Sequence, residues 1–97
     1  MRTDLTGFQY NMLVVLTNME EPSGRELKQK LEESLDCSLP HGRLYRNLDT
    51  LVDKELVKKG CIDGRTNYYE ISASGEEAIH ERFKWEQEHI ESSELTS

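Results

Sequence analysis

The stretch GRLYRNLDTLVDKELVKKG (42–60), followed by DGRTNYYEISASG (63–75), decides the fold of this 97-residue chain. Its first part has leucines at helical spacing, Leu44, Leu48 and Leu51, which predicts an amphipathic helix. The sequence then changes to short runs rich in β-branched and aromatic residues around an Asp-Gly pair, which predicts a β-hairpin. We therefore expect a helix followed directly by a hairpin.

Further helices are expected on both sides of this stretch. Three capping boxes, each a hydroxyl residue with Glu or Gln three positions later, mark helix starts at Thr6, Ser23 and Ser74. The hairpin strands are expected at 57–62 and 67–71. The predicted fold is α+β, mainly α: a winged helix-turn-helix with a C-terminal dimerisation helix. Its helices are expected from about Gly7 to Met19, from Ser23 to about Leu35, from Ser38 or Pro40 to about Lys54, and from Ser74 to about Ser92.

Length and composition limit the function classes. A chain this short buries only about 60% of its unfolded surface, so a partner would add stability. No run of about 20 apolar residues and no signal peptide are recognisable, so we expect a cytoplasmic protein without membrane contact. No phosphate loop and no nucleophile with a nearby base can be found, so we do not expect an enzyme.

The cysteines do not indicate a metal centre. Cys37 and Cys61 are far apart in the sequence and have no further ligands at zinc spacing, so no metal and no cofactor are expected. We interpret them as ordinary reduced thiols, with redox sensing as the alternative.

The net charge of −7 would disfavour nucleic-acid binding if it were spread evenly. Residues 41–69, however, hold six basic and four acidic side chains and form the only positive third of the chain. A phosphate-binding surface is therefore expected there. The acidic remainder predicts a halophilic protein, whose DNA affinity stays flat or rises as salt increases because salt screens carboxylate repulsion.

Long hydrogen-bond donors gather on one side of the predicted third helix, away from its leucines. Arginine can pair bidentately with guanine, asparagine can pair with adenine, and threonine can contact a thymine methyl, so this side is typical of a recognition helix in the major groove. The solvated polar face of an ordinary surface helix is the alternative. The candidate contacts on this side are Arg43, Arg46, Asn47, Thr50 and Lys54.

The predicted hairpin favours the DNA interpretation. Lys58, Lys59 and Arg65 give it three cations, and a wing of this kind contacts backbone phosphates or the minor groove. Four residues near the expected helix starts complete the candidate set. One of them, His41, is taken as a phosphate contact, with a surface group or a pH sensor as alternatives. The four are Ser23, Arg25, His41 and Tyr45.

The last predicted helix is assigned to dimerisation because it is mostly polar, and its few apolar residues need the surface of a partner to pack on. Two copies would present recognition helices about 34 Å apart on a pseudo-palindromic site. An effector pocket lined by aromatic residues is the alternative, and the effector itself is unknown. We expect a DNA-binding domain at 1–73, the dimerisation helix at 74–92 and a disordered tail at 93–97. The dimerisation candidates are Ala78, Ile79, Phe83, Trp85 and Ile90.

The stretch quoted first also resembles the winged-helix core of PadR-type transcriptional regulators. The family's glycine–leucine–tyrosine motif falls on Gly42, Leu44 and Tyr45. The similarity spans about Leu5 to Trp85. Further matches are the spaced leucines and the wing-exit tyrosine with the residues that follow it, which here are Leu48, Leu51, Tyr69, Ile71, Ser72 and Gly75.

The resemblance implies a homodimeric repressor of double-stranded DNA, whose C-terminal helix packs on the first helix of the partner. The single C-terminal helix and the acidic balance look most like the short branch of the family, with its haloarchaeal members and the related repressors of their viruses. A winged helix that binds proteins without DNA is the alternative function.

Overall fold

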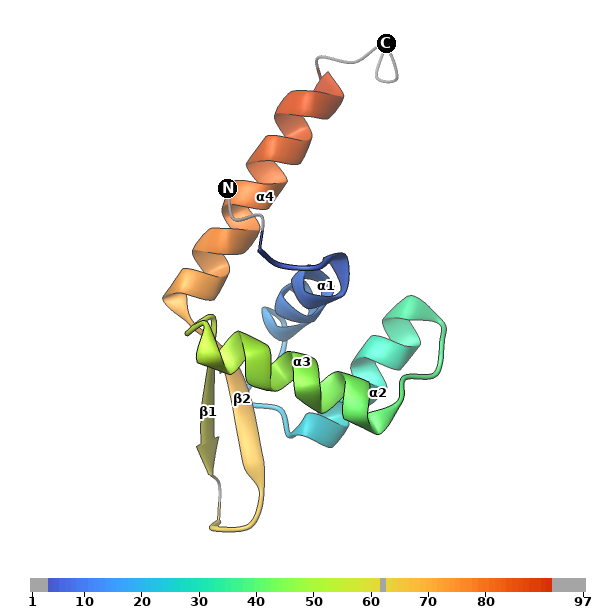
Figure 1. Cartoon of the computed structure of the whole chain (residues 1–97), viewed down its shortest axis with the longest axis vertical. Coiled ribbons are helices and arrows are strands. Elements are labelled where there is room, and N and C mark those ends of the chain that lie inside the picture. The colour runs from blue at the N-terminus through green and yellow to red at the C-terminus, as the bar shows by residue number, and fades with distance from the viewer. Residues whose placement is uncertain (1–3, 62, 92–97) are drawn as a thin grey trace.

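The computed structural model describes residues 4–61 and 63–91. Three helices, α1 (Gly7–Leu16), α2 (Gly24–Leu35) and α3 (His41–Asp53), precede a hairpin of β1 (Val57–Cys61) and β2 (Asn67–Ile71), and α4 (Ala73–Glu91) follows. Figure 1 shows the hairpin and α4 extending toward opposite ends of the long axis, with the three other helices between them. The predicted order of elements and the winged-helix fold class are confirmed. The predicted tail and the last predicted residue of each of two elements, Ile62 and Ser92, lie outside the described residues.

The core lies where the first three helices meet β2. The leucines Leu44, Leu48 and Leu51 of α3 are fully buried, as their spacing predicts, and they pack with Leu27 of α2 and Tyr69 of β2. Each fully buried leucine side chain contributes about 1.5–3 kcal/mol relative to an exposed one. Burial of these leucines fixes which sides of α3 remain accessible.

Two of the three predicted capping boxes are present. Thr6 Oγ1 accepts the Gln9 N–H at 3.1 Å, while Gln9 Oε1 accepts the Thr6 N–H at 3.0 Å. Ser23 and Glu26 repeat this exchange at the start of α2. The predicted end of α1 at Met19 is wrong, since the helix stops three residues earlier. The backbone bonds there change to the tighter i−3 pattern, as in Met19 N–H to Leu16 O at 3.1 Å.

The third predicted capping box is wrong, because α4 begins two residues earlier than a cap at Ser74 would place it. The Ser72 hydroxyl accepts the Gly75 N–H at 3.0 Å and donates to Glu55 O at 2.8 Å. The Ser72 N–H also donates to Leu56 O at 3.0 Å. These contacts to the turn after α3 make the earlier serine the cap. A Cβ on Gly75 would overlap Leu56 O, so this close crossing requires glycine.

The turn between α2 and α3 sets the angle between these helices. Asp36 ends α2 in the left-handed region, with φ 51°. Leu39 is buried, and its N–H donates to the Glu32 carboxylate at 2.7 Å. Pro40, one of the two predicted starts of the third helix, is its N-cap. The start of α3 is therefore held rigidly beside α2.

The hairpin lies against the segment that precedes α2. Its strands pair antiparallel from Val57 with Ile71 to Cys61 with Asn67. The Tyr69 N–H of β2 donates to Pro22 O at 2.9 Å, and Ser23 forms an isolated bridge with Tyr68. The strand therefore brings the first turn of α2 next to the wing.

The turn at the wing tip is built by Asp63 and Gly64. Gly64 has a φ of +83°, which glycine adopts without strain. The Asp63 carboxylate accepts the N–H groups of Arg65 and Thr66, both at 3.1 Å. The predicted Asp-Gly turn is present and has a fixed shape.

The first part of α4 belongs to the core, and the rest leaves it. Ala78 is only 3% exposed and its side chain packs inside its own domain, so its burial does not support the predicted role in dimerisation. Ile79 is partly buried against the core. Phe83, Trp85 and Ile90 are 58%, 40% and 52% exposed.

None of the described helices is long and apolar enough to span a bilayer.

Candidate nucleic-acid interface

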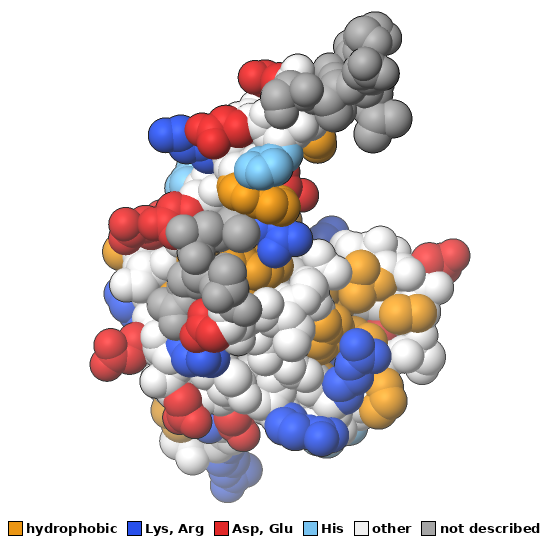
Figure 2. Space-filling view, turned by 45° about the horizontal axis from the view of Figure 1, so that its top comes forward, with side chains coloured by type: hydrophobic (Ala, Val, Ile, Leu, Met, Phe, Trp, Pro, Cys, Tyr) orange, Lys and Arg blue, Asp and Glu red, His pale blue; other side chains and the backbone are white. Residues whose placement is uncertain are grey.

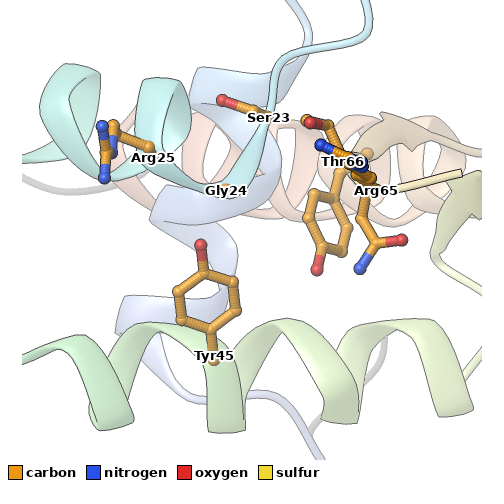
Figure 3. A pocket seen from close by; sticks show the side chains of 8 residues that line it. Ser23, Gly24, Arg25, Tyr45, Arg65 and Thr66 are labelled. Carbon is orange, nitrogen blue, oxygen red and sulfur yellow. The ribbon is translucent and has the colours of Figure 1, made fainter. Parts of the chain in front are cut away.

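A cleft of about 410 Å³ opens between the first turn of α2, the first turns of α3 and the hairpin tip. In Figure 3 the Tyr45 ring extends from α3 toward α2, with Arg25 on one side and Arg65 and Thr66 on the other. Five residues of the predicted DNA-binding set or of the family motif thus meet, although they come from three elements. The full lining is Ser23, Gly24, Arg25, Tyr45, Arg65, Thr66, Asn67 and Tyr69.

Close packing fixes the position of Tyr45. A Cβ on Gly24 would overlap the outer end of the Tyr45 ring, so the ring keeps its position against α2 only with glycine there. The His41 ring lies 4.4 Å from the Tyr45 ring, centroid to centroid, and is tilted by 44°. The Tyr45 ring is therefore packed between α2 and the His41 ring, and it lines the cleft.

The chemistry of the cleft suits an anion. None of its lining residues is acidic, and Arg25 and Arg65 are both exposed to solvent. The N-terminal end of α2 adds the partial positive charge of its free N–H groups. Burial raises the pKa of the Tyr69 phenol, and Tyr45 and Asp49 raise it further, so this hydroxyl stays neutral and able to donate. This combination matches a backbone phosphate.

The outward face of α3 coincides only in part with the side that the donor pattern indicated, since Arg46 belongs to both. The residues that point away from the leucine core are Gly42, Arg46, Asp49 and Asp53, and all are exposed. The predicted donor side, which lacks acids, instead turns toward α1 over most of its length. Within α3, Arg46 is the basic residue at the centre of the outward face, and it lies about one turn from Asp49 and two turns from Asp53.

Three residues of the predicted donor side have partners in the N-terminal part of the chain. The Arg43 guanidinium lies 4.4 Å from the centroid of the Phe8 ring. The Lys54 ammonium lies 2.7 Å from the Asp4 carboxylate. The third, Asn47, accepts a hydrogen bond from Gln9 Nε2 at 3.0 Å.

Thr50, the fourth residue on this side, bonds its own helix. Its hydroxyl donates to Arg46 O at 3.0 Å. The predicted side is therefore held mainly by intramolecular contacts.

The two wing lysines lie on opposite faces of the hairpin. Lys58 is opposite Glu70 in the register, whereas Lys59 is opposite the buried Tyr69. Side chains directly across a strand pair share a face, and neighbours along a strand alternate. Lys59 therefore lies on the same face of the hairpin as Tyr69, which lines the cleft, and Lys58 lies on the other face beside a carboxylate.

Sequence reasoning did not name several residues of this site. Gly24, Thr66 and Asn67 line the cleft without charges that would have marked them. Gly24 follows a predicted cap, which locates it but does not reveal the ring beside it. Gln9 was recognised only as part of a capping box, and nothing in the spacing indicates its bond to Asn47.

The protein surface is electrostatically mixed. Figure 2 shows acidic and basic side chains interspersed on one face, without a continuous basic area. The described side chains include no group of three or more His, Cys, Asp or Glu that could hold a metal ion. Cys37 and Cys61 are exposed free thiols. The cleft is thus a local concentration of donors on an otherwise acidic protein.

A second groove, of about 230 Å³, lies between α1 and α4. Tyr10 and Val14 of α1 face Ile79 and Phe83 of α4 across it. The Arg82 guanidinium lies 4.7 Å from the centroid of the Tyr10 ring. Two of the predicted dimerisation residues therefore lie at a groove that is partly apolar.

Comparison with known proteins places these features in a family. The model of the "Transcriptional regulator PadR-like family" matches residues 12–81. The structure of H. salinarum RosR is 41% identical over 94% of this chain and 82% of that chain, with a TM-score of 0.84. No protein with curated functional information matches the chain.

Two more distant structures share the fold. Bacillus subtilis PadR in complex with operator DNA is 24% identical over 80% of this chain and 47% of that chain, with a TM-score of 0.68. F93 from STIV, a winged-helix DNA-binding protein, is 19% identical over 78% of this chain and 83% of that chain, with a TM-score of 0.69.

Proposed function

The chain belongs to the PadR-like family of transcriptional regulators, and we propose that it binds double-stranded DNA sequence-specifically as a homodimer and represses the genes whose operators it occupies. The observation that carries this proposal is the acid-free cleft beside the exposed first turns of α3. The protein works in the cytoplasm by occupying DNA and not by catalysis.

The cleft and the outward face of α3 have different tasks in this proposal. A backbone phosphate lies in the cleft, held by Arg25, Arg65, the Tyr45 hydroxyl and the N–H groups at the start of α2. This contact fixes α3 with its first turns in the major groove. Arg46 then faces the base edges, where its guanidinium can pair with a guanine.

The rest of the predicted contact set surrounds this centre. His41, Arg43 and Lys59 are exposed near the start of α3 or on the wing face that carries Tyr69, and they contact flanking phosphates. Lys58 can contact the DNA backbone only from the face of the wing opposite Tyr69. The contributions of Thr50 and Lys54 are smaller, because each already has an intramolecular partner.

Dimerisation is assigned to the exposed part of α4. Phe83, Trp85 and Ile90 would leave large apolar areas in water in a monomer. The groove beside α1 offers a surface on which the partner's helix can pack. The two functional parts are residues 1–73 for DNA and 74–92 for dimerisation, and pairing them presents two copies of α3 on one face of DNA, about 34 Å apart.

Selection of bound fragments from genomic DNA tests this proposal. We expect enrichment of a pseudo-palindrome with half-sites about one helical turn apart, and binding of the enriched fragment about a thousandfold tighter than its scrambled version. A monomer in light scattering at micromolar concentration would contradict the dimer. Equal binding of specific and scrambled DNA, or none, would instead favour a winged helix that binds proteins.

A further inference from the structure

The start of α1 is linked to α3 by a continuous chain of side-chain hydrogen bonds. Gln9 is a polar residue that is only 7% exposed. Its Oε1 accepts the Thr6 N–H at 3.0 Å, and its Nε2 donates to Asn47 Oδ1 at 3.0 Å. Both ends of the Gln9 amide are therefore used inside the protein.

The Asn47 amide is also used at both ends. Its Oδ1 accepts from Gln9, and its Nδ2 donates to Arg43 O at 2.8 Å. An asparagine that recognises adenine needs both its carbonyl and its amino group for the base. Pairing with a base would have to use the remaining lone pair of Oδ1 and the remaining hydrogen of Nδ2, and any rotation of the amide toward a base would leave the nearly buried Gln9 amino group without this acceptor.

The helix that carries Gln9 also touches the predicted dimerisation helix. Tyr10 and Val14, on another side of α1, face Phe83 and Arg82 of α4. α1 therefore lies between α4, which sets the position of the partner, and α3, which enters DNA. Among the described side chains, Gln9 and Asn47 form a hydrogen bond between α1 and α3, beside the ring contact of Arg43 with Phe8 and the exposed pair of Lys54 with Asp4 just before α1.

We propose that Gln9 and Asn47 are a positioning pair, which holds α3 at a fixed orientation to α1 and α4 and so sets the half-site spacing that the dimer accepts. Asn47 does not recognise a base. This inference rests on the proposed function, because it concerns how the same DNA surface is oriented.

The test compares the full-length variants Gln9→Ala, Asn47→Ala and the double variant on operators with native spacing and with one or two base pairs inserted. Each single variant is expected to lose about tenfold in affinity at native spacing, and the double variant no more than either single one, because both remove the same link. All three should discriminate less against the inserted spacings, with unchanged base preferences and unchanged binding of random DNA. Gln29→Ala, at an exposed glutamine of α2, is the matched control and should behave as wild type.

Asn47→Asp keeps the inference testable if the alanine variants fold poorly. A carboxylate still accepts from Gln9 Nε2 but can donate neither to adenine nor to Arg43 O, so this variant keeps the link to α1 and should keep the base preferences and spacing preference of wild type. A changed base preference in the Asn47 variants, with no effect of Gln9→Ala, would overturn the positioning role. Failure of wild type to prefer its operator over scrambled DNA would overturn the proposed function itself, so the wild-type measurement separates the two failures.

Discussion

The two edges of α3 lie in different surroundings. Along the edge that faces α1, Arg43, Asn47 and Lys54 all contact residues of the N-terminal segment. Along the edge that faces the wing, Tyr45 opens onto a cleft with two exposed arginines and no acid in its lining. The comparison teaches that a polar stripe on a helix does not identify a DNA-binding face until the neighbouring helix is known.

Salt gives the largest expected effect on this comparison. A DNA binder that makes six to ten phosphate contacts loses about 10³–10⁵-fold in affinity between 50 and 200 mM salt. For this protein we expect a flat or rising affinity, because salt screens its acidic surface and cations can be taken up between phosphates and acids such as Asp49 and Asp53 on the outward face of α3. Operator affinity and melting temperature measured from about 0.1 to 2 M KCl test this. A steep fall in affinity without a gain in melting temperature would contradict it.

Arg46→Ala tests the outward face of α3 between the two edges. We expect a loss of about 1–3 kcal/mol on the operator and relaxed preference at one base position, because Arg46 pairs with a base edge. Competitive titration against operators substituted at each position measures both. Unchanged affinity and preference would remove Arg46 from the interface, and Lys30→Ala, at an exposed lysine of α2 that does not line the cleft, serves as a control for the loss of a positive charge.

Gly24→Ala tests whether the cleft edge depends on close helix packing. The added Cβ would displace the Tyr45 ring, and overpacking of this kind costs about 1–3 kcal/mol. We expect a lower melting temperature together with weaker binding of all DNA sequences. The control is Gly7→Ala, because a Cβ there meets no atom within 4 Å. Equal behaviour of the two variants would show that Tyr45 is not held as described.

Arg65→Ala and Lys54→Ala compare one cation from each edge. Arg65 lines the cleft, so its loss should weaken specific and random DNA about equally and reduce the number of released counterions by about one. Lys54 is paired with Asp4, so its loss should cost less than about 0.5 kcal/mol. Salt-dependent titrations of both variants measure this difference. A larger effect at Lys54 than at Arg65 would reverse the assignment of the two edges.

Local signals in the sequence predicted most of the fold. The leucine spacing located the buried side of α3, and the Asp-Gly pair located the wing turn. Two capping boxes marked the starts of α1 and α2, because a cap depends on residues only three apart. The cleft was anticipated in part, as Arg25, Tyr45 and Arg65 were candidates before their proximity was known.

Several differences from the sequence-based expectations depend on contacts between distant segments. Ser72 replaces Ser74 as the cap of α4 because the backbone carbonyl of Glu55, 17 positions earlier, accepts a hydrogen bond from the Ser72 hydroxyl. Ala78 is buried because the first turns of α4 pack on the core. Asn47 faces Gln9, which is 38 positions away. Helical periodicity tells which residues share a side, but not which neighbour covers that side.

An NMR titration of the ¹⁵N-labelled protein with its selected operator tests the central claim, that the cleft edge of α3 faces DNA and the Gln9–Asn47 pair on the α1 edge does not. We predict large shifts for the backbone N–H groups of Gly24, Arg25 and Arg65, and unchanged side-chain amide signals for Gln9 and Asn47. Scrambled DNA at the same concentration is the control and should produce smaller shifts in the same cleft residues. Shifts of the Gln9 and Asn47 amides, with a cleft that does not respond, would contradict the account.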